Sequence, residues 1–446
     1  MRKIGILSLV ALASIVVGWT SRTELKSTLS SFIAAPTIPN GMVEIPQGRA
    51  LIGMTEDDMM YQGIPAKMIS FSAFYMDETE VTNAQYREFV NWVRDSIAIT
   101  MLGPSTAPNL FIAQPQGTIA SGPAMIDWSK AKAKGAIWGA GNAFSTKLDA
   151  MYYSGLDALP GRKEIDVRKL RYAYSYVDYD LAVAYKNDPT KTRSDFIVNY
   201  TDNPRPGKPN EYPSVPVYPD TLAWKSDFEY SQNDPMVLTY FSHPSYNNYP
   251  VVGVTWEQAN AYANWKTKTH ANENKMKKVP ANAQYTFRLP TEQEFEYAAR
   301  GGVEKAKYPW GTDELYEENT RKGKNGEDCC LLANFKSNTG NYTEDNGMYT
   351  MPVKSFKPNG YGLYNMAGNV AEWTSTTYNR SSNSFLLDFN PNYNVVGKTR
   401  KVVKGGSWKD IAYNLQNASR TFEMQDKPTS YIGFRLVASI AGAGSK

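Results

Sequence analysis

Cysteine and histidine are scarce in this chain of 446 residues, which contains two of each. The two cysteines, Cys329 and Cys330, are neighbours, and adjacent residues rarely satisfy disulfide geometry. We therefore expect no structural disulfide, and the pair also lacks the ligand spacing of a zinc site. His243 and His270 have no Ser or Cys partner nearby in the sequence, which disfavours covalent catalysis by a nucleophile and its base. We expect surface or packing roles for both histidines.

The chain also lacks a strong imbalance of charge, since its formal net charge is +4. Its densest basic stretch, residues 266–278, is interrupted by Thr, Asn and Glu, which is typical of a solvated helix end. No glycine pattern of a Walker or dinucleotide-binding loop is present. These absences disfavour nucleic-acid binding and nucleotide-dependent chemistry.

Long apolar runs are absent apart from one at the N-terminus, Ile4 to Trp19. This run is shorter than the roughly 20 residues that cross a bilayer, and it follows basic residues as a signal-peptide core does. We expect residues 1–20 to form a signal or anchor segment and the polar residues 21–40 to form a linker. Residues 41–446 should then form a soluble, exported body.

The body has the composition of a folded protein, with 42% hydrophobic and 13% aromatic residues. Capping boxes, in which Ser or Thr and a Glu or Gln three positions on satisfy each other's backbone N–H groups, mark helix starts. They occur at Thr82 with Gln85, Thr255 with Gln258, and Thr291 with Glu294. The first helix should bury a stripe at helical spacing, formed by Tyr86, Phe89, Val90, Val93 and Ile97.

Short apolar segments predict strands at residues 285–289, 401–403 and 433–437. Two apolar clusters within residues 42–54 flank Gln47-Gly48 and predict a hairpin there. Helices and strands alternate irregularly among Gly- and Asn-rich turns. This arrangement favours an α+β fold over a parallel α/β sheet.

An insertion with weak periodicity occupies about residues 98–250. Within it, residues 168–185 are consistent with a helix that carries Tyr172, Tyr176 and Tyr179 on one side. Residues 220–250 are strongly aromatic. Tyrosine-rich surface is typical of contact sites, but these side chains could equally pack the insertion onto the body.

Five motifs together resemble the formylglycine-generating-enzyme (sulfatase-modifying-factor) family. They are RLPTEQEFEYAARGG (288–302), YPWG (308–311), NGYGLYNMAGNVAEW (359–373), KGGSW (404–408) and IGFRLV (432–437). The resemblance covers most of the chain outside the insertion and implies the fold of that family, which is related to C-type lectins.

The enzymes of that family oxidise a substrate cysteine with two cysteines of their own, between the segments matching KGGSW and IGFRLV. Residues 409–431 of this chain contain no Cys, and two histidines cannot supply the three-His iron site of related sulfoxide-forming enzymes. The resemblance therefore implies an inactive member of the family. Two alternatives stay open: a glycan- or peptidoglycan-binding module, and an active oxidase or other enzyme in the same cleft that uses Asp410, Arg420, Glu423 and Asp426.

The resemblance also implies structural Ca²⁺ sites, and their mixture of carbonyl, amide and carboxylate oxygens suits this hard cation. One would use the side chains of Asn365 and Glu372 with the carbonyls of Gly368 and Val370. Another would use the side chains of Asn334 and Asp345 with the carbonyls of Phe335 and Gly347. A turn network without an ion is the alternative at both places.

The carboxylates Asp77, Glu78 and Glu80 could supply an acid/base pair, but we expect them to stabilise electrostatically the N-terminus of the helix that follows them.

A narrower resemblance rests on FYMDETEVTN (74–83), WVRDSIA (92–98), VDYDLA (177–182) and FSHPSYNNYPVVGV (241–254). These segments are similar to the GldK/PorK lipoprotein family of gliding motility and type IX secretion, with the sister component GldJ as an alternative. The resemblance implies a non-catalytic protein on the periplasmic face of the outer membrane. It also implies a homo-oligomeric ring with a GldN/PorN-type partner. The lipid-bearing Cys expected after the N-terminal run is absent, so the mode of anchoring stays open.

Overall fold

The computed structural model describes residues 38–53, 65–112, 124–133, 135–138, 144–208, 210–227, 232–276, 284–317, 330–337, 343–395, 397 and 399–440. The expected signal or anchor segment, most of the expected linker and Cys329 lie outside these residues. Within the described part of the chain, no helix is both long enough and apolar enough to span a membrane.

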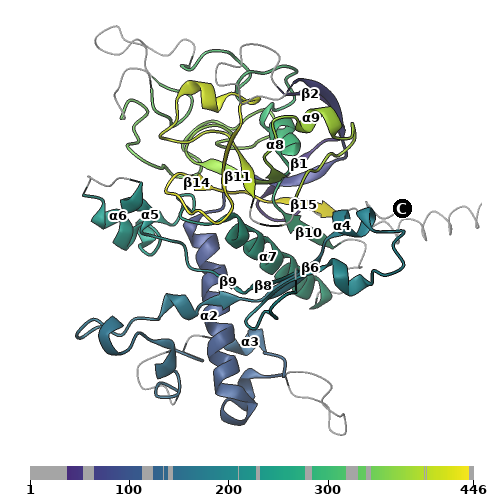
Figure 1. Cartoon of the computed structure of the whole chain (residues 1–446). Helices are drawn as coiled ribbons and strands as arrows, with labels where there is room; N and C mark the ends of the chain where they lie inside the picture. Colours follow the sequence, from purple (N-terminus) through teal and green to yellow (C-terminus); the bar gives the residue numbers. More distant parts are fainter. Residues whose placement is uncertain are drawn as a thin grey trace, which may run out of the picture.

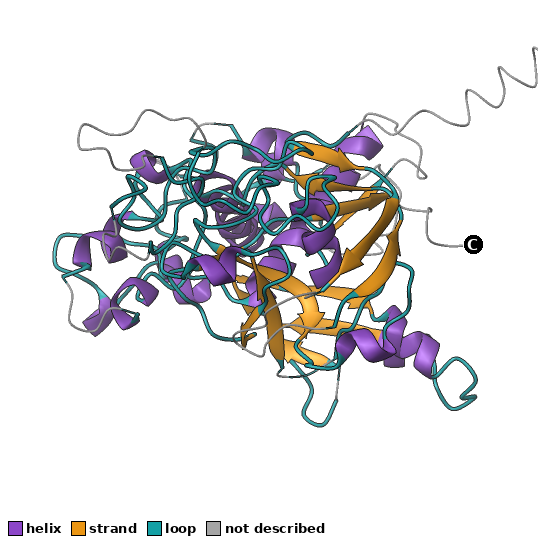
Figure 2. Cartoon of the chain, turned by 90° about the horizontal axis from the view of Figure 1, so that it is seen from above, coloured by secondary structure: helices purple, strands orange, loops and turns teal. Residues whose placement is uncertain are grey.

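The chain folds as an α+β protein, as predicted, with short strands, few long helices and extended connections (Figures 1 and 2). The helices are α2 (Asn83–Thr106), α3 (Trp128–Ala131), α4 (Tyr179–Ala184), α5 (Ala223–Ser226), α6 (Asp234–Thr239), α7 (Trp256–Met276), α8 (Glu292–Ala299) and α9 (Ser382–Phe385). The strands are β1 (Met42–Ile45), β2 (Gly48–Ile52), β3 (Lys67–Phe71), β4 (Phe74–Asp77), β5 (Arg171–Tyr172), β6 (Tyr174–Val177), β7 (Ile197–Thr201), β8 (Glu211–Pro213), β9 (Val215–Pro216), β10 (Tyr285–Arg288), β11 (Ala371–Thr377), β12 (Arg400–Lys404), β13 (Thr421–Met424), β14 (Ile432–Gly433) and β15 (Val437–Ile440).

Two four-stranded sheets form the centre of the body. One has the order β1-β4-β15-β10 and is antiparallel, and the other has the order β13-β12-β11-β14 with a parallel pair at β11 and β14. The hairpin predicted within residues 42–54 is wrong, because β1 pairs with β4 and β2 pairs with β3. The chain turns at Gln47-Gly48, but the strands on its two sides enter different sheets, and the hydroxyl of Tyr297 bonds to the Pro46 carbonyl at this turn.

The capping boxes predicted at three helix starts are present. Gln85 N–H donates to the Thr82 hydroxyl at the start of α2, and the equivalent bonds open α7 and α8. Four residues of the predicted α2 stripe are buried and Ile97 is half-buried against them. Helix α2 continues to Thr106, so the expected start of the insertion lies inside this helix.

The predicted strands are present at β10 and β12, whereas the one predicted at residues 433–437 divides between the ends of β14 and β15. The helix considered for residues 168–185 is wrong, because Tyr172 belongs to β5, Tyr176 to β6, and only Tyr179 to the short helix α4. The tyrosines at 172, 174 and 176 alternate with other residues, which is the spacing of a strand. The rings of Tyr174 and Tyr176 stack along β6, and the ring of Tyr172 in the preceding strand β5 stacks on Tyr174.

The insertion and the body share one hydrophobic core. It joins Phe89 of α2, Tyr172 of β5 and Tyr262 of α7 with Phe434, and the Phe89 and Tyr172 rings lie 5.4 Å apart at their centroids. Figure 1 shows α2, α3 and the strands β8 and β9 below α7, with the two central sheets above it. The insertion is therefore packed onto the body. Its α3, β8 and β9 lie in the lower lobe of this view, whereas its α5 and α6 lie at the left beside the body, where Trp224 and Tyr240 pack with Val370 and Trp408.

Candidate functional site

The resemblance places the reactive cysteines within residues 409–431. In this chain, side chains of that segment form hydrogen bonds and ion pairs with one another and with the body. The Asp410 carboxylate accepts from the Ser407 N–H at 2.9 Å and from its hydroxyl at 2.6 Å. Arg420 is 1% exposed and its Nε lies 2.8 Å from a Glu292 carboxylate oxygen. Glu423 pairs with Lys427 at 3.0 Å. Among the residues of the alternative enzyme, Arg420 is thus buried in a contact with a body helix, away from solvent.

Lys409 lies close to one aromatic ring and to three acidic side chains. Its ammonium lies 3.2 Å from the ring centroid of Tyr431, and Asp410, Asp227 and Glu423 are the acids near it. Burial lowers the pKa of Lys409, while these acids raise it in part. The cluster contains carboxylates, an amine and a phenol, but no thiol occurs anywhere in residues 409–431.

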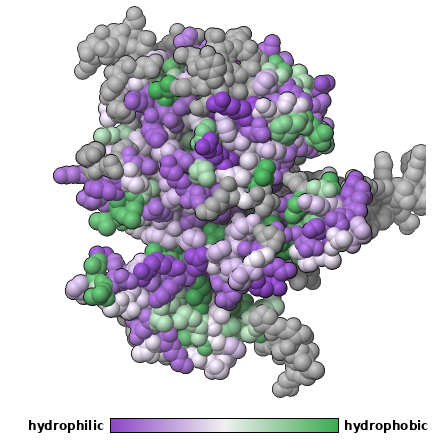
Figure 3. Space-filling view, viewed as in Figure 1, coloured by the Kyte–Doolittle hydropathy of each residue, from purple (hydrophilic) through white to green (hydrophobic). Residues whose placement is uncertain are grey.

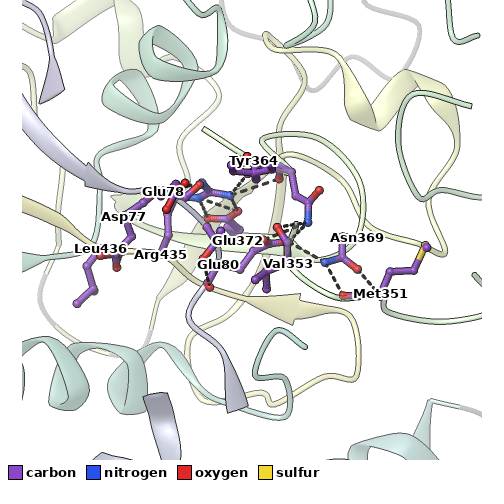
Figure 4. A network of polar contacts seen from close by, with 12 residues as sticks. Asp77, Glu78, Glu80, Met351, Val353, Tyr364, Asn369, Glu372, Arg435 and Leu436 are labelled. Carbon is purple, nitrogen blue, oxygen red and sulfur yellow. Dashed lines mark hydrogen bonds and ion pairs between the residues drawn. The ribbon is translucent and has the colours of Figure 1, made fainter. Parts of the chain in front are cut away.

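A second cluster is a buried polar network at the centre of the body (Figure 4). Arg435, between β14 and β15, is fully buried and its guanidinium donates to both carboxylate oxygens of Glu372 in β11, at 2.8 Å from Nε and 2.7 Å from Nη2. Nη2 also donates to the Tyr364 carbonyl at 2.8 Å. The arginine of IGFRLV therefore joins the acid of GNVAEW to the loop that precedes it.

Glu80 is the second buried acid of the network. Its carboxylate accepts from the side-chain amide of Asn369 at 2.8 Å and from that of Asn365 at 3.1 Å. Burial raises the pKa of Glu80 to about 8; Arg435 opposes this rise and the nearby Glu372 adds to it. Asn365 and Asn369 have φ of 48° and 62°, a left-handed conformation that asparagine tolerates better than most residues. The YNMAGN segment thus turns both amides onto Glu80.

The remaining carboxylates of FYMDETE form a hydrogen bond and ion pairs with neighbouring segments. Asp77 accepts from the Leu436 N–H at 3.0 Å and pairs with Lys266 at 3.2 Å, and Glu78 pairs with Lys354 at 2.7 Å. The first turn of α2 contains no acidic residue, and its cap is the Thr82 hydroxyl. The polar contacts of these acids are therefore with the residue before β15, with α7 and with the loop at Lys354, and not with the N-terminus of α2.

The residues of the first expected Ca²⁺ site lie together in this network. Asn365 Oδ1 is buried and has no hydrogen-bond partner within the chain, while the Glu372 carboxylate is paired with Arg435. Gly368 and Val370 lie in the turn between them, and Gly368 has φ of 80°. Glu80 and Glu372 are both buried here, so the surroundings are rich in oxygen. This donor set fits a hard cation.

The residues of the second expected site also lie together, and the Asp345 carboxylate and the Asn334 side-chain amide already have partners within the chain. Asp345 accepts from the Phe335 N–H and from the Gly347 N–H, each at 2.9 Å. The Asn334 side-chain amide donates to the Tyr349 carbonyl at 2.8 Å. Residues 338–342 of the intervening loop lie outside the described chain. In the described part of this loop, hydrogen bonds within the chain stabilise the turns.

No group of three or more His, Cys, Asp or Glu side chains within the described ranges is arranged to hold a metal ion, so the expected sites depend on amide and main-chain oxygens. The histidines have the kind of role that we predicted. His243 is exposed and accepts from the Ser245 N–H, and the His270 ring packs against those of Tyr285 and Phe287.

Comparison with known families identifies the fold. The model of the sulfatase-modifying factor enzyme 1-like domain matches residues 31–167 and 175–440. The chain belongs to this family, the class that the motifs of the body indicated.

Among characterised relatives, the formylglycine-generating enzyme of Mus musculus is 36% identical over 195 residues, which are 43% of this chain and 45% of that protein. The enzyme of Thermomonospora curvata is 36% identical over 197 residues, 43% of this chain and 56% of that one. The inactive Cα-formylglycine-generating enzyme 2 of Mus musculus is 32% identical over 196 residues, 43% of this chain and 49% of that one. The chain spans about half the length of these relatives. The solved structure of PvdO from Pseudomonas aeruginosa superposes over 89% of this chain and 94% of its own, with a TM-score of 0.44 and 16% identity.

Proposed function

We propose that this chain is a non-catalytic building block of the gliding-motility and type IX secretion machinery, of the GldK/PorK type. One observation carries the non-catalytic part of the proposal: residues 409–431, where this family holds its reactive cysteine pair, contain no cysteine. The GldK/PorK type rests on the resemblance of residues 74–83, 92–98, 177–182 and 241–254. The family also includes relatives described as inactive, which supports the use of this fold without its oxidase chemistry.

The proposal places the protein on the periplasmic face of the outer membrane, in a ring with a GldN/PorN-type partner. A contact surface for such a ring is available at the tip of the insertion, where Met101, Ile112 and Met125 are 46%, 50% and 68% exposed. Ile112 N–H donates to the Met125 carbonyl, so these two apolar side chains belong to one surface. Figure 3 shows apolar residues gathered on this lower lobe. Burial of such side chains drives association.

Affinity purification of the tagged protein from cell envelopes, followed by electron microscopy, tests the assembly. Rings that contain a second protein of the GldN/PorN type are expected. The double variant Ile112→Asp, Met125→Asp should lose them, because a charge at each position opposes burial. Leu387→Asp, at a 76% exposed position in the body, is the matched control and should keep them. Recovery of monomer alone, with normal secretion in a deletion strain, would refute the proposal.

The absence of catalysis has a direct assay. The purified chain, incubated with copper and a cysteine-containing peptide, should leave the thiol unoxidised beyond the rate of a protein-free control. Conversion of the peptide cysteine to formylglycine would contradict the proposal, since it would require a reactive group other than a cysteine pair in residues 409–431.

We also propose that Ca²⁺ binds beside Glu80, at the site of Asn365 and Glu372. The support is the partnerless Asn365 Oδ1 together with two buried acids, Glu80, which accepts from the Asn365 amide, and Glu372, which pairs with Arg435. Equilibrium dialysis should detect Ca²⁺ bound to the parent protein and to the Asp345→Asn variant, but not to the Glu372→Gln variant. Dialysis that detects no bound Ca²⁺ in the parent protein would leave the network as an ion-free structural element.

A further inference from the structure

A cavity of about 380 Å³ lies between the insertion and the body. Its volume falls within the range of small-molecule sites, roughly 300–1,000 Å³. Tyr176, Tyr200 and Tyr212 of the β6-β7-β8 sheet line one side, and Trp256, Glu257 and Lys401 of the body line the other. The cavity is separate from the Glu80 network, and its lining includes Gln425 and Asp426 of the loop 409–431. Neither the family motifs nor the proposed assembly gives it a role.

The tyrosine side of the cavity belongs to a stack of aromatic rings. Tyr174, Tyr200 and Tyr212 are direct neighbours across the three strands, and their rings stack at 4.8 Å and 5.4 Å between centroids. The rings therefore cover one another's inner faces, and Tyr212, on the edge strand β8, has one face that the stack does not cover. Tyr176 extends the stack along β6 and is 37% exposed, so the stack can be reached from solvent. The stack offers a ligand this one ring face together with ring edges and hydroxyl groups.

The opposite side of the cavity is polar and its charges balance. Glu257 accepts from the Gln425 side-chain amide at 2.6 Å. Lys401 is 1% exposed, donates to Asn394 at 2.5 Å and lies 4.2 Å from the ring centroid of Trp256. The cavity lining also includes the cation Arg171 and the acid Asp426, so two cations face two carboxylates.

We propose that this cavity binds a short, neutral saccharide. A sugar ring has apolar C–H faces that pack on aromatic rings and hydroxyl groups that bond to carboxylates, amides and amines. A purely apolar ligand would remove water from the Glu257 carboxylate without adding to the bond that it accepts from the Gln425 amide, which is costly. An ionic ligand would meet charges of its own sign as well as of the opposite one. A neutral polyhydroxy ligand satisfies both sides of the cavity.

Isothermal titration calorimetry of the full chain with cellobiose, maltose and chitobiose tests the proposal. At least one of these sugars should bind, and glucuronic acid should bind more weakly than glucose. Tyr212→Ala and Glu257→Gln should each weaken binding about tenfold or more. The first removes an aromatic ring that contacts the sugar, and the second replaces a charged hydrogen-bond acceptor by a neutral amide. Tyr212→Phe should retain most of the affinity, since the stacking ring is kept.

Tyr179→Ala is the matched control, because Tyr179 is 74% exposed and does not line the cavity. Thermal unfolding of each variant confirms that it is folded. The proposal is overturned if none of the sugars binds at millimolar concentration, if the cavity variants bind as well as the parent, or if Tyr179→Ala weakens binding as much as Tyr212→Ala does. These outcomes do not bear on the proposed ring, which is assayed through Ile112 and Met125.

Discussion

The body and the insertion of this protein are stabilised by different chemistry. The centre of the body buries acids and one arginine in a single network, in which Glu80, Glu372 and Arg435 are 0% exposed. In the insertion, the contacts across β6, β7 and β8 are between stacked tyrosine rings and not between charged side chains. Removing one partner from a buried ion pair costs far more than removing one ring from a stack. The body should therefore respond to substitution and pH more sharply than the insertion.

The largest effect is expected for Arg435→Met. The substitution keeps much of the volume but leaves Glu372 and Glu80 buried without their cation, which should lower the free energy of unfolding by about 3–5 kcal/mol. Urea denaturation followed by circular dichroism measures it. Arg162→Met is the control, since Arg162 pairs with Glu164 on the surface and the two side chains are 64% and 40% exposed. An equal loss in both variants would contradict the special cost of the buried network.

The next effect is a dependence on pH that Glu80 imposes on the body. Burial raises the pKa of Glu80 from 4.5 to about 8, so between these values the folded protein holds a proton that the unfolded chain releases. Stability from this group is therefore full below pH 4.5 and is lost as the pH rises toward 8. In EDTA, Glu80→Gln should remove this decline, and the variant should gain on the parent from pH 5 to pH 8.

The same titration distinguishes an ion-bound from an ion-free network. A bound Ca²⁺ would favour the ionised form of Glu80 and so remove the decline in the parent protein. Parallel denaturation curves for parent and variant in EDTA, at every pH between 5 and 8, would show that Glu80 does not have the raised pKa.

For the insertion we predict a smaller effect from Tyr174→Leu. Tyr174 is 5% exposed and stacks on Tyr172, Tyr176 and Tyr200, so the variant loses three aromatic contacts but keeps most of its apolar burial. A loss of about 1–2 kcal/mol is expected in urea denaturation. Tyr179→Leu, in the exposed part of α4, should change little. If Tyr174→Leu costs as much as Arg435→Met, the two regions do not differ as proposed.

The sequence alone predicted features of this fold that depend on neighbouring residues. The capping boxes at Thr82, Thr255 and Thr291 were confirmed because each needs only residues three positions apart. The hairpin near Gly48 was wrong because β1 takes its partner from a segment beyond β2 and β3. Tyr172, Tyr176 and Tyr179 have helical spacing, but the alternation through Tyr174 places the first two in strands.

In the candidate site, too, the sequence predicted residues that share one motif but not their partners from distant segments. Asn365 and Glu372 could be named from one motif, whereas their partners could not. Glu80 is 285 positions from Asn365, and Arg435 is 63 from Glu372. The arginine of IGFRLV was visible as part of a motif, but nothing local indicated which acid it would meet. The cavity beside Tyr200 was also missed, because its two sides come from segments that are distant in the sequence.

The smallest predicted difference compares one helix cap in each region. The Thr291 hydroxyl accepts from the Glu294 N–H at the start of α8, a helix whose residues are all buried, and Thr291→Ala should cost about 1 kcal/mol. Asp178 caps the short helix α4 through the Leu181 N–H at 3.0 Å. Because α4 can open locally while the core stays folded, Asp178→Ala should leave global unfolding nearly unchanged and should speed hydrogen exchange in residues 179–184 alone. Equal shifts of the urea midpoint in the two variants would mean that the insertion unfolds together with the body, as the core they share at Phe89 and Tyr172 permits.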